Sequence, residues 1–94
     1  MAPEQVLGQQ VGEPADIYSF GILLFEMFTG QKPLTGDTVE RLFYMILHEP
    51  VDLAPLRASG APDAIADLVA QCTAKKAEER VQSFSEVVRR LEAL

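Results

Sequence analysis

The side chains able to carry chemistry in this sequence are few and stand far apart. Cys72 is the only cysteine and His48 the only histidine, so neither an internal disulfide nor a cluster of thiolate and imidazole metal ligands can form within the chain. Cys72 falls on an apolar stripe with no group placed to activate it, which favours a structural thiol over a nucleophile. His48 ends a predicted helix, where an imidazolium interacts favourably with the helix dipole.

Other arrangements that support catalysis are missing from the sequence. Gly8 and Gly12 lie too far apart for a phosphate-binding loop, and no strand precedes them. Ser19 stands two residues before Gly21, but inside a predicted helix and not on the strand-to-helix turn of a nucleophilic serine. We therefore predict no catalytic, cofactor-binding or metal-binding residue in this chain.

Composition restricts the class of protein. The chain of 94 residues is 48% apolar and 23% charged, which favours one small folded domain over a disordered chain. Eight basic and fourteen acidic residues give a net charge of −6. Because a phosphate backbone is bound by clustered lysines and arginines, we predict no nucleic-acid partner. The lone cysteine and the absence of an apolar leader favour a cytoplasmic location, and the most apolar stretch, 17–28, is too short for a membrane segment.

The elements that must position these side chains are all predicted to be helices. A short helical segment over 3–9 has proline in its first turn, where the missing N–H costs nothing. Gly12 and Pro14 mark the loop that follows, and 49–61 is predicted to be a long surface loop. No run alternates apolar and polar residues at period two, so we predict an all-α domain.

The central helix is predicted over residues 15–29. Asp16 stands at its start, where a carboxylate can accept hydrogen bonds from free backbone N–H groups, and Gly30 stands at its end. Apolar residues lie on every side of this helix, which is typical of a helix that other elements enclose. The remaining helices have one apolar stripe each and can cover only part of it, so we expect uncovered apolar surface.

Three amphipathic helices follow the central one. Their apolar residues recur at positions i, i+3, i+4 and i+7, which indicates one buried face each. Asp37 precedes Glu40 by three residues, the spacing of a capping box, and Ser83 precedes Glu86 by the same spacing. The three stripes are Val39, Leu42, Phe43 and Ile46; Ile65, Leu68, Val69 and Cys72; and Phe84, Val87, Val88 and Leu91.

Two motifs carry a family resemblance. The chain opens with Ala2-Pro3-Glu4, which is similar to the A-P-E motif that closes the activation segment of protein kinases. The continuation Gln5-Val6-Leu7 is similar to the P-E-Q form common in bacterial Ser/Thr kinases. Residues 16–33, DIYSFGILLFEMFTGQKP, resemble the central F helix of the kinase C-terminal lobe. The resemblance implies that the G, H and I helices are 38–48, 62–73 and 83–94.

The resemblance also implies roles for single residues. Glu4 is expected to pair with Arg80, which matches the arginine between the H and I helices, and the pair would anchor the activation segment. Asp16 is expected to cap the F helix and to accept hydrogen bonds from the catalytic-loop backbone. Leu23 and Met27 are expected to support the hydrophobic column beneath the adenine.

Glu26 is the carboxylate within the apolar helix, and two interpretations of it stay open. It either contacts basic protein substrates or is a carboxylate satisfied at the edge of the lobe. The chain departs from the family pattern around Arg80 and at Leu34. Lys76-Ala77 stands where the family usually has Asp-Pro before Arg80, Val81 stands where it often has proline after it, and Leu34 replaces the usual aromatic residue.

The family activity implied is transfer of a phosphoryl group from ATP, with Mg²⁺, to protein hydroxyls. The glycine-rich loop, the strand-borne lysine, the catalytic loop and the metal-binding aspartate all precede A-P-E in the family. We therefore expect 1–94 to be a partial kinase domain, inactive alone, that supplies scaffold and part of the substrate-docking surface to the remainder of the domain. The alternative is a non-catalytic interaction module whose F and G helices bind a partner.

Overall fold

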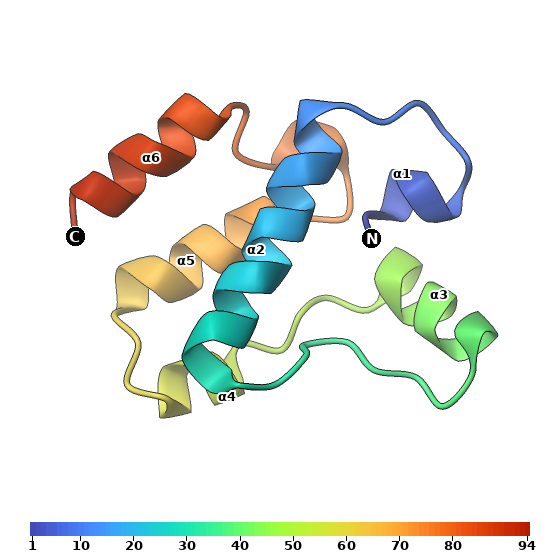
Figure 1. Ribbon diagram of the computed structural model, residues 1–94, viewed down its shortest axis with the longest axis horizontal. Coiled ribbons are helices and arrows are strands. Elements are labelled where there is room, and N and C mark those ends of the chain that lie inside the picture. The colour runs from blue at the N-terminus through green and yellow to red at the C-terminus, as the bar shows by residue number, and fades with distance from the viewer.

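A computed structural model describes all residues 1–94 as six α-helices and one 3₁₀ turn, with no strand. α2 runs through the middle of the molecule and packs along α5, while α3 lies on the other side of α2 (Figure 1). The predicted all-α fold is confirmed. The elements are α1 (Pro3–Val6), α2 (Glu13–Thr29), α3 (Val39–His48), α4 (Ala54–Ala58), α5 (Asp63–Cys72), the 3₁₀ turn Ala77–Glu79 and α6 (Phe84–Glu92).

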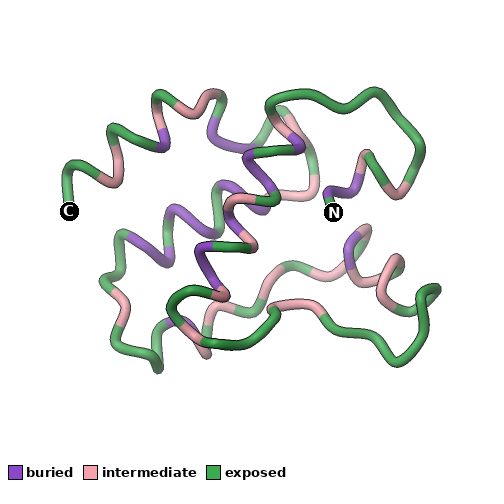
Figure 2. The backbone as a smooth tube through the Cα atoms, in the orientation of Figure 1, coloured by how far each residue is buried: buried purple, intermediate pink, exposed green.

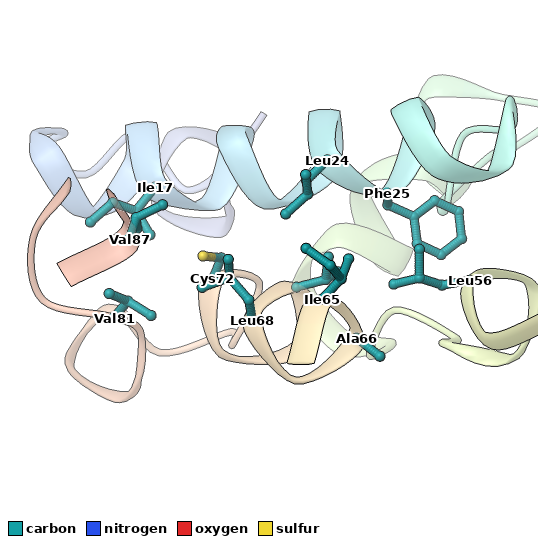
Figure 3. Packing of buried hydrophobic residues seen from close by; sticks show 11 residues of the cluster. Ile17, Leu24, Phe25, Leu56, Ile65, Ala66, Leu68, Cys72, Val81 and Val87 are labelled. Atoms are coloured by element: carbon teal, nitrogen blue, oxygen red, sulfur yellow. The ribbon is translucent and has the colours of Figure 1, made fainter. Parts of the chain in front are cut away.

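The core lies between α2 and α5. Ile17, Leu24 and Phe25 point from α2 toward α5, and Leu56 of α4 lies against Phe25 (Figure 3). All four residues of the predicted α5 stripe are buried, so that prediction is confirmed. The cluster comprises Ile17, Leu24, Phe25, Leu56, Ile65, Ala66, Leu68, Val69, Cys72, Val81 and Val87.

Gly21 allows α2 and α5 to approach closely. A Cβ atom added to Gly21 would lie 2.7 Å from Cys72 Cβ and 2.8 Å from Thr73 Cγ2. Thr73 is itself fixed, because its hydroxyl donates to Val69 O at 2.7 Å. Burial raises the pKa of the Cys72 thiol to about 11, which agrees with the structural role predicted for it.

The predicted start of the central helix is wrong. α2 begins at Glu13, with Gly12 at the N-cap and Pro14 in the first turn, and no side chain caps it. Asp16, the predicted cap, is exposed within the first turn of α2, and its own N–H already donates to Gly12 O. Pro14 was assigned to the loop, but proline is favoured in a first helical turn as well. The end is as predicted, because Gly30 adopts φ 68° at the C-cap.

Two further local predictions need correction. Segment 49–61 is not all loop, because it contains α4, whose Leu56 is completely buried. α3 is capped by Thr38, not by Asp37, since the Thr38 hydroxyl accepts a hydrogen bond from Arg41 N at 3.1 Å. The cap of α3 was misplaced by one position because Asp37 and Thr38 are adjacent and both residue types favour the N-cap position.

The predicted cap of α6 is confirmed. Ser83 is the N-cap, and its hydroxyl accepts a hydrogen bond from the N–H of Glu86 at 3.2 Å. The carboxylate of Glu86 does not close a capping box but binds Arg89 one turn along the helix. The first stripe residue, Phe84, packs edge-to-face on Phe20 of α2, with ring centroids 6.1 Å apart.

The expected uncovered apolar surface lies on α2. Leu23 is 51% exposed and Met27 71% exposed, with Phe28 beside them. The Cα atoms extend over 36 × 27 × 16 Å. Because one helix is about 10 Å wide, the shortest dimension has no room for a third layer of helices over this side of α2. Figure 2 shows buried positions gathered along α2 and α5.

Two members of the predicted apolar stripes are exposed to solvent. Val39 in α3 is exposed, and so is Val88 in α6, because no element of this chain covers these parts of the two helices. None of the helices combines the length and the hydrophobicity needed to cross a bilayer.

Candidate functional site

A buried ion pair joins α1 to the segment between α5 and α6. Arg80 Nη1 donates to Glu4 Oε2 at 2.7 Å, and Nη2 donates to Glu4 Oε1 at 2.9 Å. The contact is therefore bidentate, the strong and directional form of this interaction. The Arg80 side chain is fully buried, and that of Glu4 is 13% exposed. The structure thus brings together the two residues that the family resemblance matched.

The rest of the Arg80 guanidinium is also hydrogen-bonded. Nη1 donates to Pro14 O at 2.9 Å, Nε to Ala74 O at 2.7 Å and Nη2 to Lys75 O at 3.3 Å. All five N–H donors of the group therefore have an acceptor. A buried cation is tolerated when it is paired and hydrogen-bonded in this way. Arg80 consequently fastens α1, the start of α2 and the chain after α5 to one point.

Local sequence explains why Glu4 faces Arg80. Pro3 begins α1 and is buried, and the N–H of buried Ala2 donates to the side-chain oxygen of Gln5 at 2.7 Å. These contacts fix a helix of only four residues and hold Glu4 in its first turn. The hydrogen bond from Arg80 lowers the pKa of Glu4 below its ordinary value of 4.5, although burial opposes the shift.

Tyr18 lies against this ion pair. Its ring centroid is 5.0 Å from Arg80 Cζ and 5.9 Å from Lys75 Nζ, so two cations contact one aromatic ring. Burial raises the pKa of Tyr18 to about 12. Its hydroxyl oxygen is the one buried side-chain polar atom in the chain without a hydrogen-bond partner.

An apolar pocket of about 190 Å³ lies between α2 and α3, and Tyr18 forms part of its wall. Two charged residues, Glu26 of α2 and Lys32 after it, also line the pocket, and neither takes part in an ion pair. A pocket of this kind accepts an apolar side chain with a charged group beside it. Its apolar lining includes Ile22, Pro33, Leu34, Leu42 and Ile46.

The other residues singled out from the sequence lie apart from the ion pair. Glu26 is half-buried in the pocket wall, while Leu23 and Met27 lie on the uncovered side of α2. Asp16 is exposed in the first turn of α2.

Sequence reasoning missed the contribution of Tyr18 and Lys75 to this site. Tyr18 stands inside a motif that was quoted only for its resemblance. Lys75 lies between two predicted helices, and no periodicity marks a residue there as partly buried.

The residues of this chain do not fit ATP or magnesium. No three His, Cys, Asp or Glu side chains lie close enough together to hold a metal ion. A second pocket, of about 280 Å³, is lined by Lys75 and Lys76 but also by Glu4 and Glu78. The carboxylates oppose a triphosphate there, and Lys75 already donates to Met45 O at 3.2 Å.

Comparison with known proteins gives a consistent match. The family described as "Protein tyrosine and serine/threonine kinase" matches residues 1–91. The chain is 37% identical over 87 residues to the DNA damage-responsive serine/threonine-protein kinase RqkA of Deinococcus radiodurans, which covers 88% of this chain and 12% of that protein. It is 35% identical over 80 residues to the serine/threonine-protein kinase PknL of Mycobacterium tuberculosis, covering 85% of this chain and 20% of PknL.

A eukaryotic relative matches equally broadly. The chain is 32% identical over 91 residues to the dual specificity protein kinase zak2 of Dictyostelium discoideum, covering 97% of this chain and 14% of that protein. The chain therefore spans between 12% and 20% of the length of these three relatives. With a family match over residues 1–91 and an all-helical fold, this chain belongs to the protein kinase family, and its fold is that of the helical C-terminal part of the kinase domain.

Proposed function

We propose that this chain is part of a Ser/Thr protein kinase, in which it holds the activation segment and supplies part of the surface on which a protein substrate docks. The bidentate Glu4–Arg80 pair carries the proposal. It fastens the segment that resembles A-P-E, the motif that closes the activation segment in the family, to the base of the helical fold. The names of RqkA and PknL support Ser/Thr specificity.

Nucleotide and metal chemistry belongs, in this proposal, to the remainder of the kinase domain. ATP and Mg²⁺ supply the transferable phosphoryl group and neutralise its charge, and no residue of 1–94 is proposed to touch either. Leu23 and Met27 would lie under the apolar column of the intact domain, which their exposure in this chain allows. Asp16 is exposed and free to accept hydrogen bonds from the catalytic-loop backbone. The proposed compartment is the cytoplasm.

The proposed docking surface is the apolar pocket. Glu26 offers a carboxylate without an ion-pair partner beside apolar walls from α2 and α3. This combination favours a substrate peptide in which a basic residue stands next to an apolar one, with the cation beside Glu26 and away from Lys32, because an unpaired carboxylate beside apolar walls attracts a cation. A synthetic peptide with arginine beside leucine should bind this chain more tightly than its glutamate counterpart. Glu26→Gln should remove the preference, whereas Glu79→Gln, an exposed change elsewhere, should not.

The mass of the native protein tests the proposal as a whole. An antibody against residues 83–94 captures the protein from cells, and intact mass and ATP-dependent protein phosphorylation are measured on the captured species. A species several-fold heavier than 10.3 kDa that phosphorylates Ser or Thr supports the proposal. A species of 10.3 kDa without activity contradicts it. Phosphoryl transfer by the pure 94-residue chain would contradict the proposal that nucleotide and metal chemistry belongs to the remainder of the kinase domain.

A non-catalytic interaction module is the second candidate, and the uncovered side of α2 favours it. Leu23, Met27 and Phe28 expose apolar surface that a partner protein would cover. In that case the isolated chain should be monodisperse, with near-UV circular dichroism from Tyr18 and Tyr44. A part of a larger domain should instead bind the dye ANS through this uncovered surface and self-associate as its concentration rises.

A further inference from the structure

α3 has little apolar packing to hold it in place. Ile46 is its one buried residue, and Val39 and Tyr44 are exposed. Its main helix neighbour is the four-residue α1, and it stands apart from the α2–α5 pair (Figure 1). Because helices in small domains are held mainly by a buried apolar face, another kind of contact must fix the position of α3.

A long-range hydrogen bond supplies that contact. Lys75 Nζ donates to the carbonyl oxygen of Met45 at 3.2 Å across 30 positions of sequence. Met45 lies in the last turns of α3, and its carbonyl also accepts the N–H of Glu49 at 2.9 Å. An ammonium group at the C-terminal end of a helix interacts favourably with the helix dipole. Lys75 therefore contacts α3 at the end where a cation is most stabilising.

Lys75 is held in turn by the Glu4–Arg80 pair. Arg80 donates to the carbonyl oxygens of Lys75 at 3.3 Å and of Ala74 at 2.7 Å, which fixes the backbone of this segment. The ammonium group of Lys75 also lies 5.9 Å from the centroid of the Tyr18 ring, which Arg80 contacts as well. Burial and the neighbouring Arg80 lower the pKa of Lys75, as expected of an ammonium group drawn into the fold.

We infer that Lys75 is a positioning residue, whose ammonium group fixes the C-terminal end of α3 relative to the Glu4–Arg80 pair and so sets the α3 wall of the apolar pocket. That wall consists of Leu42 and Ile46, and Ile46 directly follows the residue that Lys75 contacts. The position of α3 follows from the contacts alone. The consequence for substrate docking rests on the proposed function.

Amide hydrogen exchange of the 94-residue chain tests the positional part. In Lys75→Met the apolar stem remains and the donor is lost, so amides in the last turn of α3 should exchange about tenfold faster. Amides of α5 should exchange at the wild-type rate. Lys76→Met is the matched control, because Lys76 is exposed and its ammonium group donates no hydrogen bond, and Lys75→Arg should restore most of the protection.

Two outcomes would overturn the positional inference. Equal α3 exchange in Lys75→Met and Lys76→Met would show that the hydrogen bond holds nothing. Equally accelerated exchange in α3 and α5 would show that Lys75 stabilises the whole fold and does not position α3.

Peptide binding tests the docking part separately. Binding of the peptide with arginine beside leucine should weaken about tenfold in Lys75→Met and stay unchanged in Lys76→Met. If amide exchange in α3 is faster in Lys75→Met but peptide binding is unchanged, the docking consequence is wrong. If Glu26→Gln also leaves binding unchanged, the proposed docking pocket has failed, while the position of α3 is still judged by its exchange rates.

Discussion

On one side of α2, the contact with α5 is apolar and tight, and at Gly21 the two helices approach so closely that a single methyl group has no room. On the other side, hydrogen bonds and one ion pair connect α3 to the segment after α5 and to α1. The residues that make these contacts are Lys75, Arg80 and Glu4. Removing atoms from apolar packing lowers the free energy of unfolding by an amount that grows with the number of atoms removed. Removing one partner of a buried polar contact loses the whole contact and leaves the other partner unpaired. The two sides of α2 should therefore respond to different kinds of substitution.

Removal of the Glu4 charge should have the largest effect. Glu4→Gln leaves the fully buried Arg80 guanidinium without its counter-charge, and breaking such a pair costs roughly 3–5 kcal/mol of the free energy of unfolding. Urea denaturation followed by circular dichroism measures the loss. Glu79→Gln, which is exposed, should stay within about 0.5 kcal/mol of the wild type. Equal midpoints for the two variants would contradict the importance given to the ion pair.

The next largest effect should come from the apolar side of α2. Gly21→Ala places a methyl group 2.7 Å from Cys72 Cβ, and such overpacking costs about 1–3 kcal/mol. In Gly12→Ala the added Cβ meets nothing nearer than Pro14 Cδ at 4.0 Å, so its effect should be smaller. Hydrogen exchange should show faster amides in α5 for Gly21→Ala. Acceleration confined to α3 would contradict the division into two sides.

Acid should reduce the contribution of the Glu4–Arg80 pair to the free energy of unfolding. Because the pKa of Glu4 is lower in the folded chain than its ordinary 4.5, the unfolded state binds more protons as the pH falls through that range. The contribution of Glu4 is therefore present above pH 4.5 and lost progressively below it. Urea midpoints across this range should fall more steeply for the wild type than for Glu4→Gln. Parallel curves would show that another carboxylate dominates the acid response.

Loss of a helix cap should give the smallest effect. Thr38 caps α3 and Ser83 caps α6, each by accepting a backbone hydrogen bond, and alanine at either position should cost about 1 kcal/mol. The two variants should differ in where the cost is felt. Thr38→Ala should speed exchange in α3 with little change in the urea midpoint, while Ser83→Ala should lower the midpoint. Identical behaviour would mean that α3 unfolds together with the core.

Sequence patterns predicted the core side of α2 well. The α5 stripe and the Ser83 cap depend on neighbours within one or two turns, and both are in place. The start of α2 was missed because Pro14 is as compatible with a first turn as with a loop. α4 was missed because five residues are too few to establish a helical period.

Sequence patterns did not predict the contacts on the polar side of α2. The match of Glu4 with Arg80 came from the family resemblance and not from spacing. The contact of Lys75 with Met45 O joins a loop to a helix 30 positions away, and no local propensity records it. Val39 and Val88 were placed on buried stripes because periodicity gives the apolar face of a helix but not whether another element covers it.

The separation of Glu4 and Arg80 also has a consequence for how the chain is made. The partners stand 76 positions apart, and synthesis at about 5–20 residues per second puts roughly 4–15 seconds between them. Throughout that interval the first helix has its carboxylate but no guanidinium to receive it, and both α2 and α5 are complete before Arg80 is added. The segment that resembles A-P-E is therefore secured only after α5 is complete, and a pause in synthesis before Arg80 would prolong the time in which it is open to proteases or chaperones.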